Sequence, residues 1–174
     1  MGKGIVDELK KEFDIQDIWQ GVEIHPETPP EGRDMSDLFP LEKREQYFLR
    51  LNEMGKDYGI VFKRSNGYLA NSRRALLLGE YAKSTNSFEA LHSALFKAYF
   101  TEGKDIGDCE VLLQLAKSAG LSREEVEQAW QNENLIHPAN ITAVPTFEIN
   151  GGDYIVGVRS YNAFREALHK AGRL

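Results

Sequence analysis

The run Ala143-Val144-Pro145-Thr146-Phe147 decides the fold of this chain, because of the pattern that follows it. Alternating apolar and polar residues over 146–150 and again over 153–156 are typical of two half-buried strands. Gly151-Gly152 lies between them, and a Gly-Gly loop suits a primed hairpin turn, which needs positive φ. A helix over 160–172 follows. The C-terminal part of the chain is therefore predicted to be a β-β-α unit whose first strand opens at the Val-Pro pair.

The rest of the chain is predicted to be mainly helical. The exception is residues 18–25, which are predicted to form a short strand. The sets Asn86–Glu89 and Ser122–Glu125 have the spacing of capping boxes. Asp108 is typical of a helix start and Gly120 of a helix end. The helices expected from apolar periodicity span residues 4–13, 41–57, 69–83, 86–99, 108–120 and 122–130.

Composition excludes several classes of protein. The 174 residues suggest one domain, with room for an inserted subdomain. A net charge of −6 argues against nucleic acid and against an anionic membrane surface as partners. The chain has no apolar run near the roughly 18 residues that a membrane span needs, and its first residues do not resemble a signal peptide. A single cysteine, Cys109, rules out an intrachain disulfide, so we expect a cytoplasmic protein.

The order helix, strand, helical block, hairpin, helix resembles the DsbA-like thioredoxin superfamily. Within it the chain is similar to the FrnE-like branch, related to 2-hydroxychromene-2-carboxylate isomerases and kappa-class glutathione transferases. The segments that carry the resemblance are 22–27, 29–32, 71–75, 143–147 and 157–161. The resemblance implies an α/β, thioredoxin-like fold with an inserted all-helical domain and with the first core strand missing. Residues 1–30 and 138–174 would form the incomplete thioredoxin-like core, and residues 31–137 the helical insertion.

The resemblance also implies where a substrate binds. Pro145 would be cis, so that Val144 presents its backbone N–H and C=O to an extended substrate, and Val144, Pro145 and Thr146 would line the groove. On the residues alone a trans proline at the start of a strand is the better interpretation, because only about 5–6% of such bonds in folded proteins are cis. The implied partner is a thiol or disulfide protein or peptide.

The departure from the family concerns catalysis. Family members carry a Cys-x-x-Cys motif before the first helix, where the helix N-terminus lowers the pKa of the thiol. Residues 1–13 contain no Cys, Ser or Thr, and the chain begins about where that motif would end. We therefore expect no catalytic residue and no activity from the chain as written. Met1 would be an internal methionine, or the start of a shortened chain, if the protein is an oxidoreductase.

Three functions stay open on the sequence. The first is a FrnE-like thiol-disulfide oxidoreductase, similar to protein disulfide isomerases, that lacks its dithiol here. The second is a redox-silent thioredoxin-like module for peptide binding or dimerisation. The third is a relative of the glutathione-linked isomerases and transferases, with glutathione as a ligand. Intact mass from native cells would separate the first two.

Secondary candidates have simpler structural interpretations. Asn71 and Ser72 could bind an anion or substrate at a helix N-terminus, but an N-cap explains them better. Arg159 and Ser160 stand where glutathione-binding relatives contact the γ-glutamyl carboxylate, and a helix cap is again the simpler explanation. Cys109, just after a cap, is best explained as a small apolar residue. The four histidines have no metal-like spacing, so we expect neither a metal nor a cofactor.

The missing strand leads to an expectation about assembly. In thioredoxin-type sheets it lies between the strand expected here at residues 17–25 and the strand at 145–150. Unpaired buried backbone groups cost about 1–3 kcal/mol each, and open strand edges recruit partners. We expect either that residues 17–25 pair directly with the hairpin or that a homodimer fills the gap. The resemblance favours the dimer, because members of this branch often dimerise.

Overall fold

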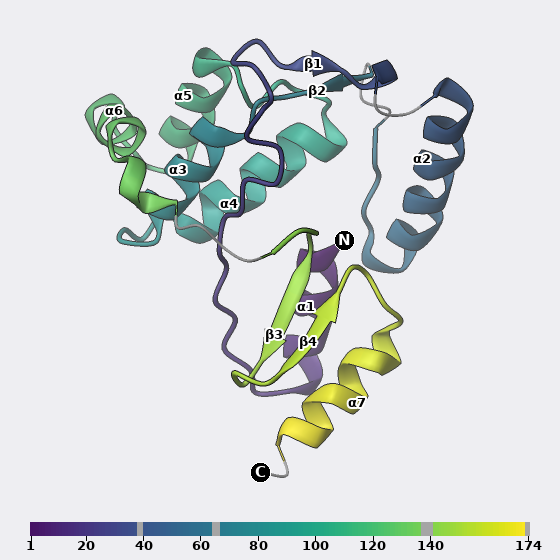
Figure 1. Cartoon of the computed structure of the whole chain (residues 1–174). Coiled ribbons are helices and arrows are strands. Elements are labelled where there is room, and N and C mark those ends of the chain that lie inside the picture. The colour runs from purple at the N-terminus through teal and green to yellow at the C-terminus, as the bar shows by residue number, and fades with distance from the viewer. Residues whose placement is uncertain (38–39, 64–66, 137–140, 173–174) are drawn as a thin grey trace.

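The computed structural model describes residues 1–37, 40–63, 67–136 and 141–172. Figure 1 shows a helical lobe above a smaller unit in which a β-hairpin lies against two helices. The helical lobe holds α3 (Arg73–Ala82), α4 (Phe88–Phe96), α5 (Cys109–Ser118) and α6 (Arg123–Gln131). The smaller unit holds α1 (Gly2–Glu12), β3 (Thr146–Ile149), β4 (Asp153–Val156) and α7 (Tyr161–Ala171). A further helix, α2 (Leu41–Gly55), stands to one side.

The core of the smaller unit lies between α1, the hairpin and α7. Ile5 and Leu9 repeat at helical spacing on α1 and are buried against Phe164 of α7. Phe147 of β3 meets Phe164 edge-on, with ring centroids 4.8 Å apart. The predicted β-β-α unit is therefore present, and α1 packs against it.

The core of the helical lobe is a separate apolar cluster. It is drawn from all four of its helices and from the turn before α6: Ala75, Leu78, Ala82, Leu91, Leu95, Leu112, Ala116, Leu121, Val126 and Ala129. The helix α4 does not stop at Phe96 but continues as a π-helical turn over Lys97–Thr101. A π-helical turn adds a residue to the turn and shifts the side chains that follow.

Two predicted helix starts are confirmed by their caps. The Asp108 side chain accepts from the backbone N–H of Glu110 and Val111, and Ser122 forms a full capping box with Glu125. The capping box predicted at 86–89 is wrong. The helix begins one residue later, so Ser87 takes the N-cap position and Glu89 stands at the second helical position, from which it cannot complete the box.

The third helix also starts later than predicted, at Arg73 instead of residue 69. Tyr68 and Leu69 form a short strand, β2 (Tyr68–Leu69), which pairs antiparallel with β1 (Arg33–Asp34). A strand needs a partner for its backbone groups, and here that partner is far away in the sequence. Local periodicity therefore could not indicate it.

The hairpin register is clear, but its loop is longer than predicted. Ile149 pairs with Asp153, which leaves three loop residues. Asn150 and Gly151 both have positive φ, at 48° and 71°, and the N–H of Gly152 donates to the carbonyl of Ile149 at 3.1 Å. Asn tolerates the left-handed region better than most residues, so it joins the turn.

The predicted strand at residues 18–25 does not form. Exposure alternates along 13–20 as it would in a strand, and Ile18 is 87% exposed. Within the described residues, however, β3 pairs with β4 alone, so no ladder joins residues 17–25 to the hairpin. The backbone here is held by side chains instead: the N–H of Gly21 donates to Glu80 Oε1 at 2.6 Å. The prediction that residues 17–25 pair directly with the hairpin is therefore wrong.

In the described part of the chain, single 3₁₀ turns lie at Met35–Asp37, Lys56–Tyr58 and Glu133–Leu135. None of the helices in the described ranges is long and apolar enough to cross a membrane. The division into a core at 1–30 and 138–174 and an insertion at 31–137 stays a prediction.

Truncating a central residue of the helical lobe should destabilise the protein. Leu91 is fully buried, and Leu91→Ala should lower the free energy of unfolding by about 2–5 kcal/mol, since it removes apolar contact and leaves a cavity. Leu49→Ala on α2 is the matched control, because Leu49 is 71% exposed, and it should change stability by less than about 0.5 kcal/mol. Urea titrations followed by circular dichroism measure both, and equal losses would contradict the assigned core.

Candidate functional site

The N-terminus of α1 meets the opening of β3, and this junction is the candidate site. A Cβ placed on Gly2 would lie 3.3 Å from Pro145 Cβ and 3.4 Å from Phe147 Cζ. Glycine at this position therefore lets the helix end approach the strand closely. Figure 1 shows the chain's N-terminus beside the upper end of β3. The first N–H groups of a helix have no partner within the helix, so they are presented at this place.

The backbone of residues 143–146, where β3 begins, is fixed by hydrogen bonds. The Val144–Pro145 peptide bond is cis, the isomer that the resemblance implies. The carbonyl of Pro145 accepts from the N–H of Gly157 at 2.8 Å, and the Thr146 hydroxyl donates to the carbonyl of Ala143 at 2.7 Å. The Val144 side chain stays 50% exposed. Of the three predicted groove residues, Pro145 and Thr146 are half-buried and Val144 offers the accessible apolar surface.

The other side of the helix end is covered by the loop after α2. A Cβ on Gly4 would lie 2.9 Å from Tyr58 Cβ and 3.0 Å from Ile60 Cδ1. No real Cβ sits that close to its neighbours, so this contact requires glycine. Burial raises the pKa of the Tyr58 hydroxyl, with further contributions from Asp57 and Glu8.

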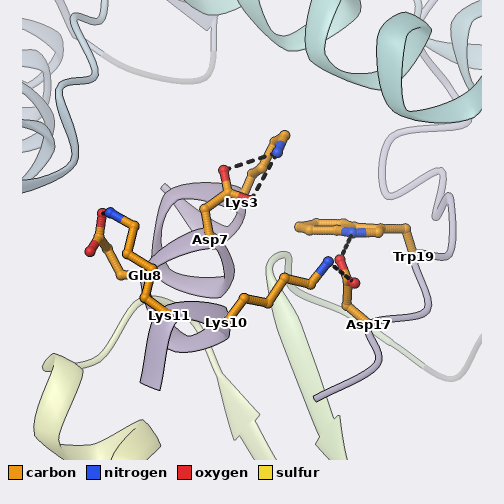
Figure 2. A network of polar contacts seen from close by, with 7 residues as sticks. All are labelled: Lys3, Asp7, Glu8, Lys10, Lys11, Asp17 and Trp19. Atoms are coloured by element: carbon orange, nitrogen blue, oxygen red, sulfur yellow. Dashed lines mark hydrogen bonds and ion pairs between the residues drawn. The ribbon is translucent and has the colours of Figure 1, made fainter. Parts of the chain in front are cut away.

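The charged side chains of α1 form ion pairs, some within the helix and some with residues beyond it. Lys3 binds Asp7 at 2.9 Å and Lys11 binds Glu8 at 2.6 Å. Lys10 pairs with Asp17, which also accepts from Trp19 Nε1 at 2.6 Å, as Figure 2 shows. Burial raises the pKa of Asp17, but the hydrogen bonds from Lys10 and Trp19 outweigh it, and the net pKa is lowered.

This network extends beyond what the sequence analysis found. Lys10, Asp17 and Trp19 are not spaced at a helix or strand period, because the chain turns between α1 and residue 17. Opposite charges that meet across such a turn leave no periodic signal. The network fixes the segment after α1, and it supplies no nucleophile.

Cys109 lies away from the junction. It is the first residue of α5 and is partly exposed. Figure 1 places α5 in the helical lobe, apart from β3 and the N-terminus. Arg74 Nη1 contacts Cys109 Sγ at 2.6 Å, and the same guanidinium lies over the ring of Trp130, 5.3 Å from its centroid. The thiol therefore cannot take part in chemistry at Pro145.

The secondary candidates occupy structural positions. Asn71 donates to the carbonyl of Thr28 at 2.6 Å and accepts from the N–H of Arg73 at 3.0 Å, which ties the preceding loop to the start of α3. Ser72 is the N-cap of α3, without a side-chain cap bond. Ser160 caps α7 by accepting from the N–H of Ala163 at 3.4 Å.

Arg159, the residue before the cap of α7, is exposed. No group of His, Cys, Asp and Glu within the described ranges could hold a metal ion. The junction thus places an exposed apolar residue, Val144, at a strand opening beside a helix N-terminus, and residues 1–13 include no cysteine, serine or threonine.

Comparisons with known proteins agree with this geometry. The family model described as DSBA-like thioredoxin domain matches residues 1–169. A relative, the uncharacterized protein YwbO of Bacillus subtilis (strain 168), is 27% identical over 180 residues, covering 97% of this chain and 88% of the relative. A crystal structure of a probable DsbA oxidoreductase, SCO1869 from Streptomyces coelicolor, superposes with a TM-score of 0.85 at 19% identity, covering 98% of this chain and 83% of that one. The predicted α/β, thioredoxin-like fold with a helical insertion is confirmed.

The close approach at Gly4 gives a sharp test of the junction. Gly4→Ala should destabilise the protein by about 1–3 kcal/mol, because the added methyl group must displace the loop at Tyr58 and Ile60. Gly79→Ala is the matched control within α3, where a Cβ would meet nothing within 4 Å. It should stabilise the protein by about 0.5–1 kcal/mol, since alanine is the better helix residue. Thermal unfolding measures both, and changes of the same sign would contradict the packing.

Proposed function

Because the chain belongs to the DSBA-like thioredoxin domain family, we propose that it binds an extended polypeptide at the opening of β3. We also propose that these 174 residues do not by themselves carry out dithiol exchange. The observation that carries both statements is the junction of α1 with Pro145. At this junction the N-terminus of α1 closely approaches Pro145, and none of residues 1–13 is a cysteine, serine or threonine.

The binding part rests on exposed surface and on an open strand edge. Val144 presents apolar surface at the strand opening. Within the described residues β3 is hydrogen-bonded to β4 on one side, and no strand pairs with its other side. An extended peptide can add to such an edge, where its main chain supplies affinity and its alternate side chains supply specificity. A second copy of this chain would use the same edge, and we propose a homodimer on that ground.

The redox part rests on the number and place of thiols. Exchange between a protein and a disulfide passes through a mixed disulfide that a second thiol resolves. The sequence has one cysteine, and it lies on α5. We place the chain in the FrnE-like branch and in the cytoplasm as parts of the same proposal. The glutathione-linked alternative gains nothing from the structure, since Ser160 is engaged as a helix cap.

The first expected result is the absence of dithiol catalysis. The purified chain should reduce insulin and rearrange scrambled disulfides no faster than the uncatalysed reaction, and Cys109→Ala should behave identically. Turnover that survives Cys109→Ala would show that another group does the chemistry. Turnover lost in that variant would make Cys109 a single-thiol nucleophile and would contradict the proposal.

The second expected result concerns binding. With an unfolded, carboxymethylated polypeptide as the probe, Val144→Glu should raise Kd by about tenfold, because a bound chain would bury the new charge. Leu49→Glu on α2 is the control, since Leu49 is also exposed, at 71% against 50% for Val144, and lies outside the hairpin. It should change Kd by less than about twofold. Titration calorimetry gives both constants. Equal effects, or no binding by the unmodified chain, would refute the assignment.

A further inference from the structure

His92 lies at the centre of a group of four rings that joins two distant parts of the chain. Its ring stacks on Phe88, with centroids 5.0 Å apart and 18° between the planes. It meets Phe96 edge-on at 4.8 Å. Both phenylalanines belong to α4, but the fourth ring, Trp19, comes from the segment after α1 and lies 4.6 Å from His92. We call Trp19, Phe88, His92 and Phe96 the His92 cluster.

The cluster is the apolar part of a docking contact. Lys83 Nζ donates to the carbonyl of Trp19, and Glu80 accepts from the N–H of Gly21 at 2.6 Å. Figure 2 shows that the indole N–H of Trp19 is held by Asp17. Segment 17–21 thus lies on α3 and α4. Because this segment follows α1, its docking sets where α1 and the opening of β3 lie relative to the helical lobe.

The imidazole is suited to this place only when it is neutral. Its Nδ1 atom is buried and has no hydrogen-bond partner among the described residues. In the neutral ring the proton can reside on Nε2, which leaves Nδ1 as an unused acceptor. In the imidazolium Nδ1 becomes a charged donor with no acceptor, a far less favourable state in an apolar surrounding.

The neighbouring charges act in both directions. Lys3 on α1 and Lys83 after α3 oppose a positive imidazole, whereas Asp17 and Asp7 favour it. Glu89 on α4 interacts with Lys10, the partner of Asp17. The aromatic faces return part of the cost as cation–π attraction. Burial is the largest effect, and it lowers the pKa of His92 to about 4.

We propose that the His92 cluster is a proton-sensitive latch: neutral His92 holds segment 17–21 on the helical lobe, and protonation releases it. The sign follows from linkage. In the released state the imidazole regains its ordinary pKa of 6.5, whereas in the docked state the pKa is lowered. The contribution of neutral His92 to docking is therefore fully present above pH 6.5 and is lost as the pH falls toward 4. Release would free α1 and the opening of β3 to move relative to α4.

The test uses the full chain with Trp130→Phe, which leaves Trp19 as the single tryptophan. Its emission should move to longer wavelength on acidification, with the half-change between pH 4 and 6.5, while far-ultraviolet circular dichroism is retained. Adding His92→Phe, which fills the ring's place but cannot take a proton, should lower the half-change by at least about one pH unit or abolish it. His169→Phe, which alters a histidine of α7 that contacts Phe13 and not the His92 cluster, should leave the half-change in place.

Three results would overturn the latch. The first is an emission of Trp130→Phe that does not move on acidification, and the second is a loss of its circular dichroism at the same pH as the emission change. The third is a half-change that stays at the same pH when His92→Phe is added. If His92→Phe fails to fold, the proton resonances of His92 in Trp130→Phe decide the question. A pKa below 6.5 that tracks the Trp19 emission supports the latch, and a pKa at 6.5 without a change at Trp19 refutes it.

Discussion

The structure depends on the close approach of one helix to its surroundings. Two glycines, Gly2 and Gly4, lie where any side chain would meet Pro145 on one side or Tyr58 on the other. Below them Ile5 and Leu9 bury the same helix against Phe164. Because Gly2 and Gly4 have no Cβ atoms, the N-terminal end of α1 can lie in close contact with Pro145 and Tyr58. Apolar packing along the rest of the helix then fixes its N-terminus at the opening of β3. The candidate site follows from that position.

The junction of α1 with β3 and the single cysteine lie in different parts of the fold. The junction of α1 with β3 brings a helix N-terminus against the cis Val144–Pro145 bond, in a chain that belongs to the DSBA-like thioredoxin domain family. The single thiol lies elsewhere: Cys109 contacts Arg74 in the helical lobe. Val144, at the strand opening, and Cys109, on α5, therefore lie in different parts of the fold.

The segment after α1 connects these two parts. It alternates between half-buried and exposed residues as a strand would, yet its contacts are made by side chains. Asp17 joins Lys10 and Trp19, and Trp19 in turn contacts His92. A strand is held by many equivalent backbone bonds, whereas this segment is held by a few specific groups. A change at one of them, such as the charge of one imidazole, can therefore affect the whole contact.

Local chemistry in the sequence determined the helices that carry their own caps, such as those that begin at Asp108 and Ser122, and the hairpin with its neighbouring helix. In each of these the interacting groups are only a few residues apart, so spacing alone indicates the structure. Only the tertiary structure decided the rest. The pairing of β1 with β2, the unpaired state of residues 18–25 and the meeting of Trp19 with His92 join groups that lie far apart in the chain. Sequence spacing carries no information about such contacts, because they depend on how the intervening elements pack.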